Sequence, residues 1–215
     1  MAPLWNQKLS TAAYTTYTST TYKQQANAQM PLGSDSGLCL GCHDGTIAPG
    51  DTVLFGTLNM QGKMLGQDNF GTTLLNSHPF SLILPIKDDI DLVSTLVQGK
   101  TADPSGAVQL IQGNVECTSC HNPHVQSTDK LSMNFLVRDG SNGQLCLACH
   151  DPTRTTANGT TTANPLAGWA TSVHATSPSK VAGTAGYGTY GTVTANACIS
   201  CHAPHNAQGP ARLLR

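Results

Sequence analysis

The eight cysteines of this sequence are its most informative residues, because they fall into four pairs with two residues between the members of each pair. A histidine follows each pair directly, which gives the pattern C-x-x-C-H four times. On one helical turn, residues i, i+3 and i+4 share a face, so two thiols and an imidazole can act on one group. This is the attachment signature of c-type haem, in which the thiols form thioethers and the histidine binds the iron. The residues are Cys39, Cys42 and His43; Cys117, Cys120 and His121; Cys146, Cys149 and His150; and Cys198, Cys201 and His202.

Disulfides and zinc sites are the other common uses of paired cysteines. Disulfides would not need the histidines, and a four-cysteine zinc site takes two pairs per metal without a fixed trailing histidine. Because the pattern recurs without exception, we expect four covalently bound haem c groups. Haem is attached to such motifs outside the cytoplasm, so we expect an exported protein that is extracellular or at the cell surface. Residues 1–10 lack the features of a signal peptide, and we interpret the chain as a mature protein.

Four further histidines remain when those of the motifs are subtracted from the total of 8. Their number equals that of the distal iron positions, which predicts two histidine ligands on every iron and low reduction potentials. Methionine is the rival ligand, but packing is the more common role of Met30, Met60, Met64 and Met133. The predicted distal ligands are His78, His124, His174 and His205.

Chain length restricts which iron each histidine can reach. Three residues span at most about 10 Å, which is too short for two ligands on opposite sides of one iron. His124 therefore cannot serve the haem held by His121, and His205 cannot serve the haem held by His202. We assign each to the haem of the preceding motif, at Cys39 and Cys42 for His124 and at Cys146 and Cys149 for His205.

The motifs also show an internal duplication. Residues 38–44 match residues 145–151, and residues 116–124 match residues 197–205, including a shared C-H-x-P-H sequence. A shorter similarity relates residues 135–138 to residues 212–215. We expect an N-terminal arm at 1–30, a first dihaem unit at 31–138 and a second at 139–215, together forming one compact domain.

The composition predicts little regular structure. Only 11% of the residues are charged and 5% are aromatic, and 21 are glycine. We therefore expect a mostly irregular, loop-rich, haem-filled multihaem cytochrome c with a few short helices and little strand. The apolar runs 80–86 and 90–97 predict a short strand and a short helix, and residues 153–196 predict a surface loop with a glycosylation sequon at Asn158.

The remaining features set limits on partners and on the N-terminal arm. Residues 11–22, rich in Thr and Tyr, predict an extended arm or edge strand, with a disordered tail as the alternative.

A net charge of -1 without a basic stripe argues against nucleic acid, and no apolar run is long enough for a membrane span. Asp44 and Asp151 follow proximal histidines, and we expect solvated caps or turns there rather than catalytic acids.

Taken together, these residues resemble the doubled-CXXCH multihaem cytochromes, and among them the tetrahaem cytochromes that polymerise into extracellular nanowires, the OmcE type. The resemblance is carried by residues 3–6, the Thr/Tyr arm, residues 38–44 and 76–80, and both C-H-x-P-H sites. It implies four bis-histidine haems in a continuous stack, head-to-tail polymerisation, and one axial histidine donated across the protomer boundary. Electrons would pass between redox donor and acceptor proteins or minerals.

The duplication then identifies a candidate for the bridging histidine. If the units are alike, His174 serves the second haem of the unit before it, at Cys117 and Cys120. The same rule for His78 finds no earlier unit, so we expect it to reach the fourth haem, at Cys198 and Cys201, of a neighbouring protomer. The alternative is an internal bond from His78 to the second haem.

Two other functions stay open at this point. A monomeric periplasmic electron shuttle commonly carries a charged docking patch, and this chain is poor in lysine. A multihaem reductase acting on a small nitrogen or sulfur compound needs an iron with an open position, and four spare histidines leave none if all of them bind.

Overall fold

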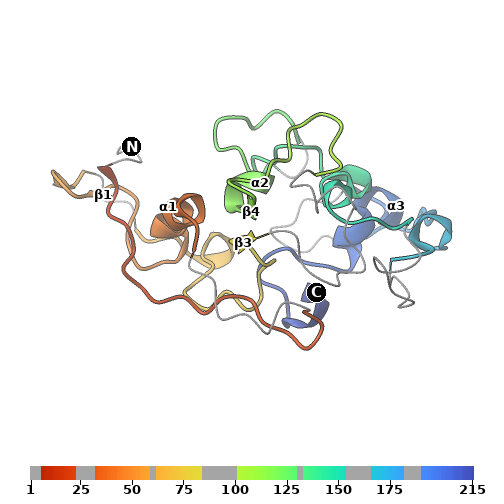
Figure 1. Cartoon of the computed structure of the whole chain (residues 1–215), viewed down its shortest axis with the longest axis horizontal. Helices are drawn as coiled ribbons and strands as arrows, with labels where there is room; N and C mark the ends of the chain where they lie inside the picture. Colours follow the sequence, from red (N-terminus) through yellow and green to blue (C-terminus); the bar gives the residue numbers. More distant parts are fainter. Residues whose placement is uncertain are drawn as a thin grey trace.

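The computed structural model describes residues 6–22, 32–58, 62–83, 101–129, 133–153, 166–181 and 190–215. Short elements joined by irregular chain make up this part of the protein, with no layered sheet or bundle among the described residues (Figure 1). The predicted fold class, loop-rich with few short helices and little strand, is confirmed. None of the described helices is long and apolar enough to cross a membrane.

The described helices are short, and four of them contain residues of the cysteine motifs. The α-helices are α1 (Ser34–His43), α2 (Cys117–Cys120) and α3 (Val193–Asn196). The 3-10 turns are η2 (Gly66–Asp68), η4 (Ser141–Gly143), η5 (Cys146–Ala148), η6 (Trp169–Thr171), η7 (Ala197–Ser200) and η8 (Ala211–Leu213). Residues of the motifs lie in α1, α2, η5 and η7, so each motif brings its own helical turn, and irregular chain connects these turns.

Two small antiparallel ribbons complete the described elements. Strand β1 (Asp51–Thr52) pairs with β2 (Gly56–Thr57), and β3 (Leu82–Ile83) pairs with β4 (Asn114–Val115). The strand predicted within residues 80–86 is confirmed by β3. The helix predicted at 90–97 and the sequon at Asn158 lie outside the described residues.

The described part of the N-terminal arm is extended. Isolated bridges join Gln7 to Thr52 and Thr15 to Thr73, and the Tyr17 hydroxyl donates a hydrogen bond to the Pro210 carbonyl. The arm thus runs from the β1–β2 hairpin along the molecule towards the C-terminal residues (Figure 1). Over residues 6–22 the extended arm is confirmed, and the disordered tail is wrong.

Apolar side chains form only a thin core. The buried apolar residues of the described part are Leu40, Leu74, Val108, Ala148, Ala197, Ala203, Ala207 and Leu213. Half of them are alanines, which bury little area, so apolar side chains contribute little stabilisation within the described residues. This accords with the expectation that bound cofactors fill the interior.

Candidate haem centres

Each C-x-x-C-H motif forms one turn that brings its first cysteine and its histidine together. The amides of His121, His150 and His202 donate to the carbonyls of the cysteines four residues earlier, at 3.0, 2.9 and 3.0 Å. The first motif lies within the last turns of α1. The predicted arrangement, with two thiols and an imidazole on one turn, is therefore present at all four motifs.

The two motifs within each predicted unit interact through their first cysteines. A hydrogen bond joins the thiols of Cys39 and Cys117, and another joins those of Cys146 and Cys198. None of the eight cysteines forms a disulfide. The first cysteines of the two motifs within each predicted unit are thus in contact.

A further link joins the two units. Cys120 of the second motif interacts electrostatically with Cys149 of the third. Burial, followed by the nearby Cys149 and Cys117, raises the pKa of Cys120 to about 12, whereas the hydrogen bond from Cys146 lowers the pKa of Cys198 to about 7. Together with the interactions inside each unit, this places the second motif near the third, so each motif lies near the next one in the sequence.

Backbone carbonyls hold three of the proximal histidines in one tautomer. The Nδ1 atoms of His43, His121 and His202 lie 2.8, 2.7 and 2.6 Å from the carbonyls of Asp68, Asn134 and Arg212. A carbonyl only accepts, so Nδ1 carries the proton and Nε2 keeps its lone pair for a metal. The imidazoles therefore fit the role of iron ligands.

Two of these carbonyls belong to a segment that follows a motif and is hydrogen-bonded to it. We call this segment the strap; it comprises residues 134–137 after the second motif and residues 212–215 after the fourth. After the second motif, Asn122 N–H donates to Phe135 O and Val137 N–H to Cys120 O, at 2.6 and 2.9 Å. After the fourth motif, Ala203 N–H donates to Leu213 O and Arg215 N–H to Cys201 O, at 2.8 and 3.0 Å. The duplication predicted from the sequence thus extends to hydrogen bonding.

The strap also corrects the predicted alignment by one residue. Phe135 matches Leu213, both with positive φ (55° and 51°), and Val137 matches Arg215. The sequence similarity had placed Phe135 against Arg212, because the two arginines at 138 and 215 were aligned. The alignment matched the two arginine side chains, but the backbone hydrogen bonds to the motif define which residues of the two straps correspond.

Two pairs of histidine rings have the spacing that one iron requires. A metal binds imidazole nitrogen at about 2 Å and the ring centre lies about 1 Å behind that nitrogen, so two trans imidazoles have centres about 6 Å apart. The ring centres of His78 and His150 are 6.3 Å apart, and those of His121 and His205 are 6.2 Å apart. The pairs fit the distal and proximal ligands of the third and second haems.

These pairs differ from the predicted ones. The His205 ring lies beside His121 of the second motif, whereas the sequence assigned His205 to the haem of Cys146 and Cys149. It lies where the sequence placed His174, and the irons of both histidines stay predictions. The His78 ring lies beside His150 of the same chain, and the predicted bridge to another protomer and its alternative, a bond to the second haem, also stay predictions.

The physical reason for the exchange is a contact between distant segments. His78 N–H donates to Pro204 O at 2.7 Å, and Ala207 N–H donates to Asn76 O at 2.9 Å. Residues 76–78 and 204–207 therefore lie side by side, and each histidine is delivered to a motif of the other unit. The reach argument excluded only the histidine's own motif and could not choose among the rest.

The remaining two distal candidates are placed differently. The side chains of His124 and His174 are exposed, and within the described ranges neither ring stacks against another aromatic or histidine ring. The structure thus brings His124 to no proximal histidine, and its assignment to the first haem stays without support. All four distal roles remain predictions, two of them with an internal partner.

Phe70 is a site residue that the sequence did not reveal. Its ring lies 5.6 Å from the His43 ring and 4.7 Å from the His205 ring, and its amide donates to His43 O at 2.7 Å. Burial and then the neighbouring His121, His78 and His43 lower the pKa of His205 to about 3. No spacing rule marks Phe70, because the contact joins segments that are distant in sequence.

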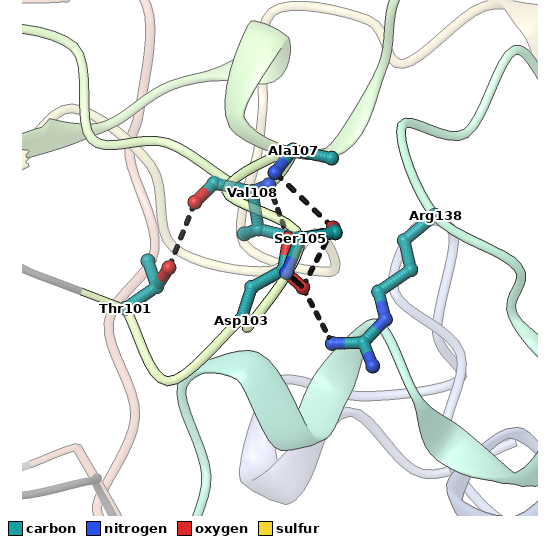
Figure 2. Close-up of polar contacts among 6 residues, drawn as sticks. All are labelled: Thr101, Asp103, Ser105, Ala107, Val108 and Arg138. Atoms are coloured by element: carbon teal, nitrogen blue, oxygen red, sulfur yellow. Dashed lines mark hydrogen bonds and ion pairs between the residues drawn. The ribbon is translucent and has the colours of Figure 1, made fainter.

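A buried ion pair supports the third motif. Asp103 accepts from Ser105 N–H and hydroxyl, from Val108 N–H and, at 2.9 Å, from Arg138 Nη1 (Figure 2). The Asp103 side chain is fully buried, and burial would raise its pKa, but these hydrogen bonds and the Arg138 charge lower it. Ala102 N–H donates to Ala148 O at 2.7 Å, so the anchored loop holds the third motif.

Asp44 corrects a further expectation. Its carboxylate is buried and accepts from the Tyr14 hydroxyl at 2.6 Å and from Thr46 N–H at 2.8 Å. The predicted turn is present, but the predicted solvation is wrong.

The described residues include no group of three or more His, Cys, Asp and Glu side chains that could hold a metal ion by themselves.

Comparison with protein families gives one match. The family described as "Doubled CXXCH motif" matches residues 111–155, which include the second and third motifs. No curated protein matches the chain. The match supports a multihaem c-type cytochrome with covalently bound haem c, acting in electron transfer rather than catalysis.

Proposed function

We propose that this protein carries four haem c groups and conducts electrons along closely stacked bis-histidine haems, polymerised head to tail as an extracellular filament. The closeness of each motif to the next is the observation that carries the proposal. Haem supplies the one-electron chemistry, and the chain's own residues set the distances between irons, hold the imidazole tautomers and keep water away.

The closeness of successive motifs favours conduction over a single redox centre. Cys39 interacts with Cys117, Cys120 lies near Cys149, and Cys146 interacts with Cys198. Haems attached at these cysteines would be neighbours, which supports electron transfer from the first motif to the fourth. A carrier that stored one electron would not require it.

The two ends of the molecule favour a polymer. The β1–β2 hairpin and α1 lie at one end of the long axis, and residues 166–181 lie at the other (Figure 1). Both ends expose large apolar side chains, including Phe55 at 65% and Val173 at 79%. A contact between unlike ends that does not close into a ring generates a fibre. The proposed partners are identical protomers, with redox proteins or minerals as electron donor and acceptor.

A reductase is the second candidate, and one observation favours it. Among the described residues, neither His43 nor His202 has a second histidine ring at ligand spacing. An iron that lacked a sixth ligand would have an open position for a small nitrogen or sulfur compound. The spin state of these two irons therefore separates the two functions.

The test uses the holoprotein purified from an export host that attaches haem c. Intact mass gives the number of haems, and negative-stain images show whether filaments form. Four haems, filaments and only low-spin iron support the proposal. Discrete monomers with four low-spin haems would instead indicate the shuttle, and high-spin ferric iron in assembled or monomeric protein would indicate the reductase.

Electron paramagnetic resonance adds an internal check on the ring pairs. The rings of His78 and His150 are nearly perpendicular, at 84°, whereas those of His121 and His205 are inclined by 32°. Perpendicular imidazoles leave two iron d orbitals nearly degenerate, so the third haem should give a highly anisotropic low-spin signal. The second haem should give an ordinary rhombic one. His78→Ala should remove only the first of these signals.

A further inference from the structure

Residues 138–140 connect the two units, and we call this segment the joint. It follows the strap of the second motif, where Val137 N–H donates to Cys120 O at 2.9 Å, and it precedes η4, which leads into the third motif. Two buried carboxylates, those of Asp103 and Asp129, accept hydrogen bonds from the joint. One binds its first residue and the other its last, so the joint is held at both ends.

Asp103 connects the joint to the third motif. Arg138 Nη1 donates to its carboxylate at 2.9 Å, and the same carboxylate accepts from Val108 N–H at 2.8 Å (Figure 2). The neighbouring Ala102 N–H donates to Ala148 O, in η5, at 2.7 Å. Because a buried charge that loses its partner is costly, the ion pair resists any movement of the joint away from this loop.

Asp129 connects the joint to the fourth motif. Its side chain belongs to a residue that is 1% exposed, and it accepts from Gly140 N–H at 2.9 Å and from the Tyr190 hydroxyl. Tyr190 N–H donates to the Asn196 side chain at 3.1 Å, and Asn196 ends α3, two positions before Cys198. The packing is tight, because a Cβ atom on Gly140 would collide with the Tyr190 hydroxyl.

The boundary between the units is where such support is needed. Within each unit, a hydrogen bond joins the first cysteines of the two motifs. Across the boundary, the described interactions of Cys120 with Cys146 and Cys149 are electrostatic, and they fix no geometry by themselves. Electron transfer slows steeply as haems move apart, because it depends on orbital overlap. Other contacts must therefore fix the spacing of the second and third motifs.

Resting on the conduction proposed above, we propose that Asp103 and Asp129 clamp the joint, and that this clamp fixes the spacing and orientation of the second and third haems for electron transfer between the units. Together with their partners Arg138 and Tyr190 they are positioning residues, since they act through the backbone of the strap and of the motifs. Displacing either unit would leave buried polar groups unpaired, which costs more than exchanging a bond with water.

The distances between irons in the oxidised holoprotein test the clamp, measured from magnetic dipolar interactions by pulsed electron paramagnetic resonance. Tyr190→Phe removes only the hydroxyl that donates to Asp129, and Arg138→Gln removes the charge opposite Asp103. Each should lengthen and broaden one distance between successive irons, and slow the spread of electrons along the chain after rapid partial reduction. The double variant should shift the same distance further.

Tyr14→Phe is the matched control, because it also removes a tyrosine hydroxyl that donates to a buried carboxylate, that of Asp44. It should lower the stability in guanidinium without changing the distance that the clamp variants change. Glu116→Ala, inside the first unit, should alter a different distance, which identifies the one that crosses the boundary. Clamp variants that lose stability but keep every iron–iron distance would have a structural role only, and the proposal would be wrong.

Gly140→Ala tests the second carboxylate by steric means. Gly140 has a φ of -79°, which alanine adopts without strain, so the substitution acts through its collision with Tyr190. It should disturb the same distance as Tyr190→Phe. Combined with Tyr190→Phe it should add little, because the hydroxyl that it meets is gone. A full additional effect would contradict the clamp.

The outcomes separate the clamp from conduction itself. If the wild type shows a magnetic interaction across the boundary and the clamp variants leave it unchanged, the clamp is wrong and conduction stands. If the wild-type irons show no interaction across the boundary, the second and third haems are not neighbours, and both proposals are wrong.

Discussion

The first and second dihaem units use different side chains at the same structural position. In the first, Ser36 and Glu116 meet: Ser36 stands three residues before the first cysteine of one motif, and Glu116 directly precedes the other motif. The Ser36 hydroxyl donates to the Glu116 carboxylate, and both residues are buried. In the second unit the matching residues are Gly143 and Ala197, also buried.

In the second unit, the two motifs are brought together by the close packing of Gly143 and Ala197. A Cβ atom on Gly143 would lie 3.4 Å from the Ala197 Cβ and 3.2 Å from the Cys198 Sγ. Glu116 instead adds a tether, because it also accepts from the Ser81 hydroxyl at 3.2 Å, and Ser81 N–H donates to Val115 O beside the β3–β4 ribbon. The comparison shows that the distance between motifs is maintained while the chemistry that maintains it differs.

Replacing Glu116 with Ala should give the largest loss of stability. Two buried hydroxyls lose their acceptor and a cavity opens between the motifs, so we expect the free energy of unfolding to fall by about 3 kcal/mol. Guanidinium unfolding followed by haem absorbance measures it. Adding Ser36→Gly copies the second unit and should recover part of the loss, with a coupling of about 1 kcal/mol. Strictly additive effects of the two substitutions would show that the Ser36–Glu116 pair is not equivalent to the Gly143–Ala197 pair of the second unit.

Gly143→Ala changes the residue of the second unit that matches Ser36 of the first. Gly143 has a φ of +69° and Cys198 Sγ lies within 3.2 Å of the added carbon, so the substitution strains the backbone and crowds the motif. We expect a cost of about 2 kcal/mol. Ser36→Ala, the matched change in the first unit, loses the hydrogen bonds of the hydroxyl to the Glu116 carboxylate and from the Cys117 N–H, but adds no strain, and should cost about 1 kcal/mol. Equal costs would contradict the close approach.

Arg138→Gln tests the ion pair that Arg138, next to the strap of the first unit, forms with Asp103. The Arg138 side chain is 22% exposed and Asp103 keeps its other donors, so we expect a loss of between about 1 and 2 kcal/mol in thermal or chemical unfolding. Arg212→Gln, at an exposed residue, should stay within about 0.5 kcal/mol.

Asp44→Asn should give the smallest effect, about 1 kcal/mol at neutral pH. Burial would raise the pKa of Asp44, but hydrogen bonds from Ser10, Tyr14 and Thr46 lower it overall. Its stabilisation is therefore present above about pH 4, the unfolded value, and is lost as the pH falls through the lower folded pKa. The difference between wild type and variant should shrink on acidification.

Asp151→Asn is the matched control for that prediction. Asp151 accepts from Thr153 N–H and hydroxyl in an exposed turn. We expect a change of about 0.5 kcal/mol. A cost equal to that of Asp44→Asn would show that burial of the carboxylate in the first unit adds nothing.

The sequence by itself determined the local chemistry of this protein. Four C-x-x-C-H patterns predict the helical turns and the proximal histidines, because each depends on residues within five positions of one another, and the duplication is read directly from the repeated sequence. The low content of charged and aromatic residues likewise predicted the loop-rich fold. The extended arm was predicted from its Thr and Tyr residues for the same local reason.

Only the tertiary structure decided which histidine faces which motif. That choice depends on the contact between residues 76–78 and 204–207, which joins segments more than a hundred positions apart. The reach of the chain excludes near partners and cannot rank far ones, so the ring pairs His78–His150 and His121–His205 could not be predicted from spacing. The strap register, Phe70 and the exchange of Ser36 and Glu116 for Gly143 and Ala197 share this origin. Each is fixed by packing between distant segments, which no local spacing records.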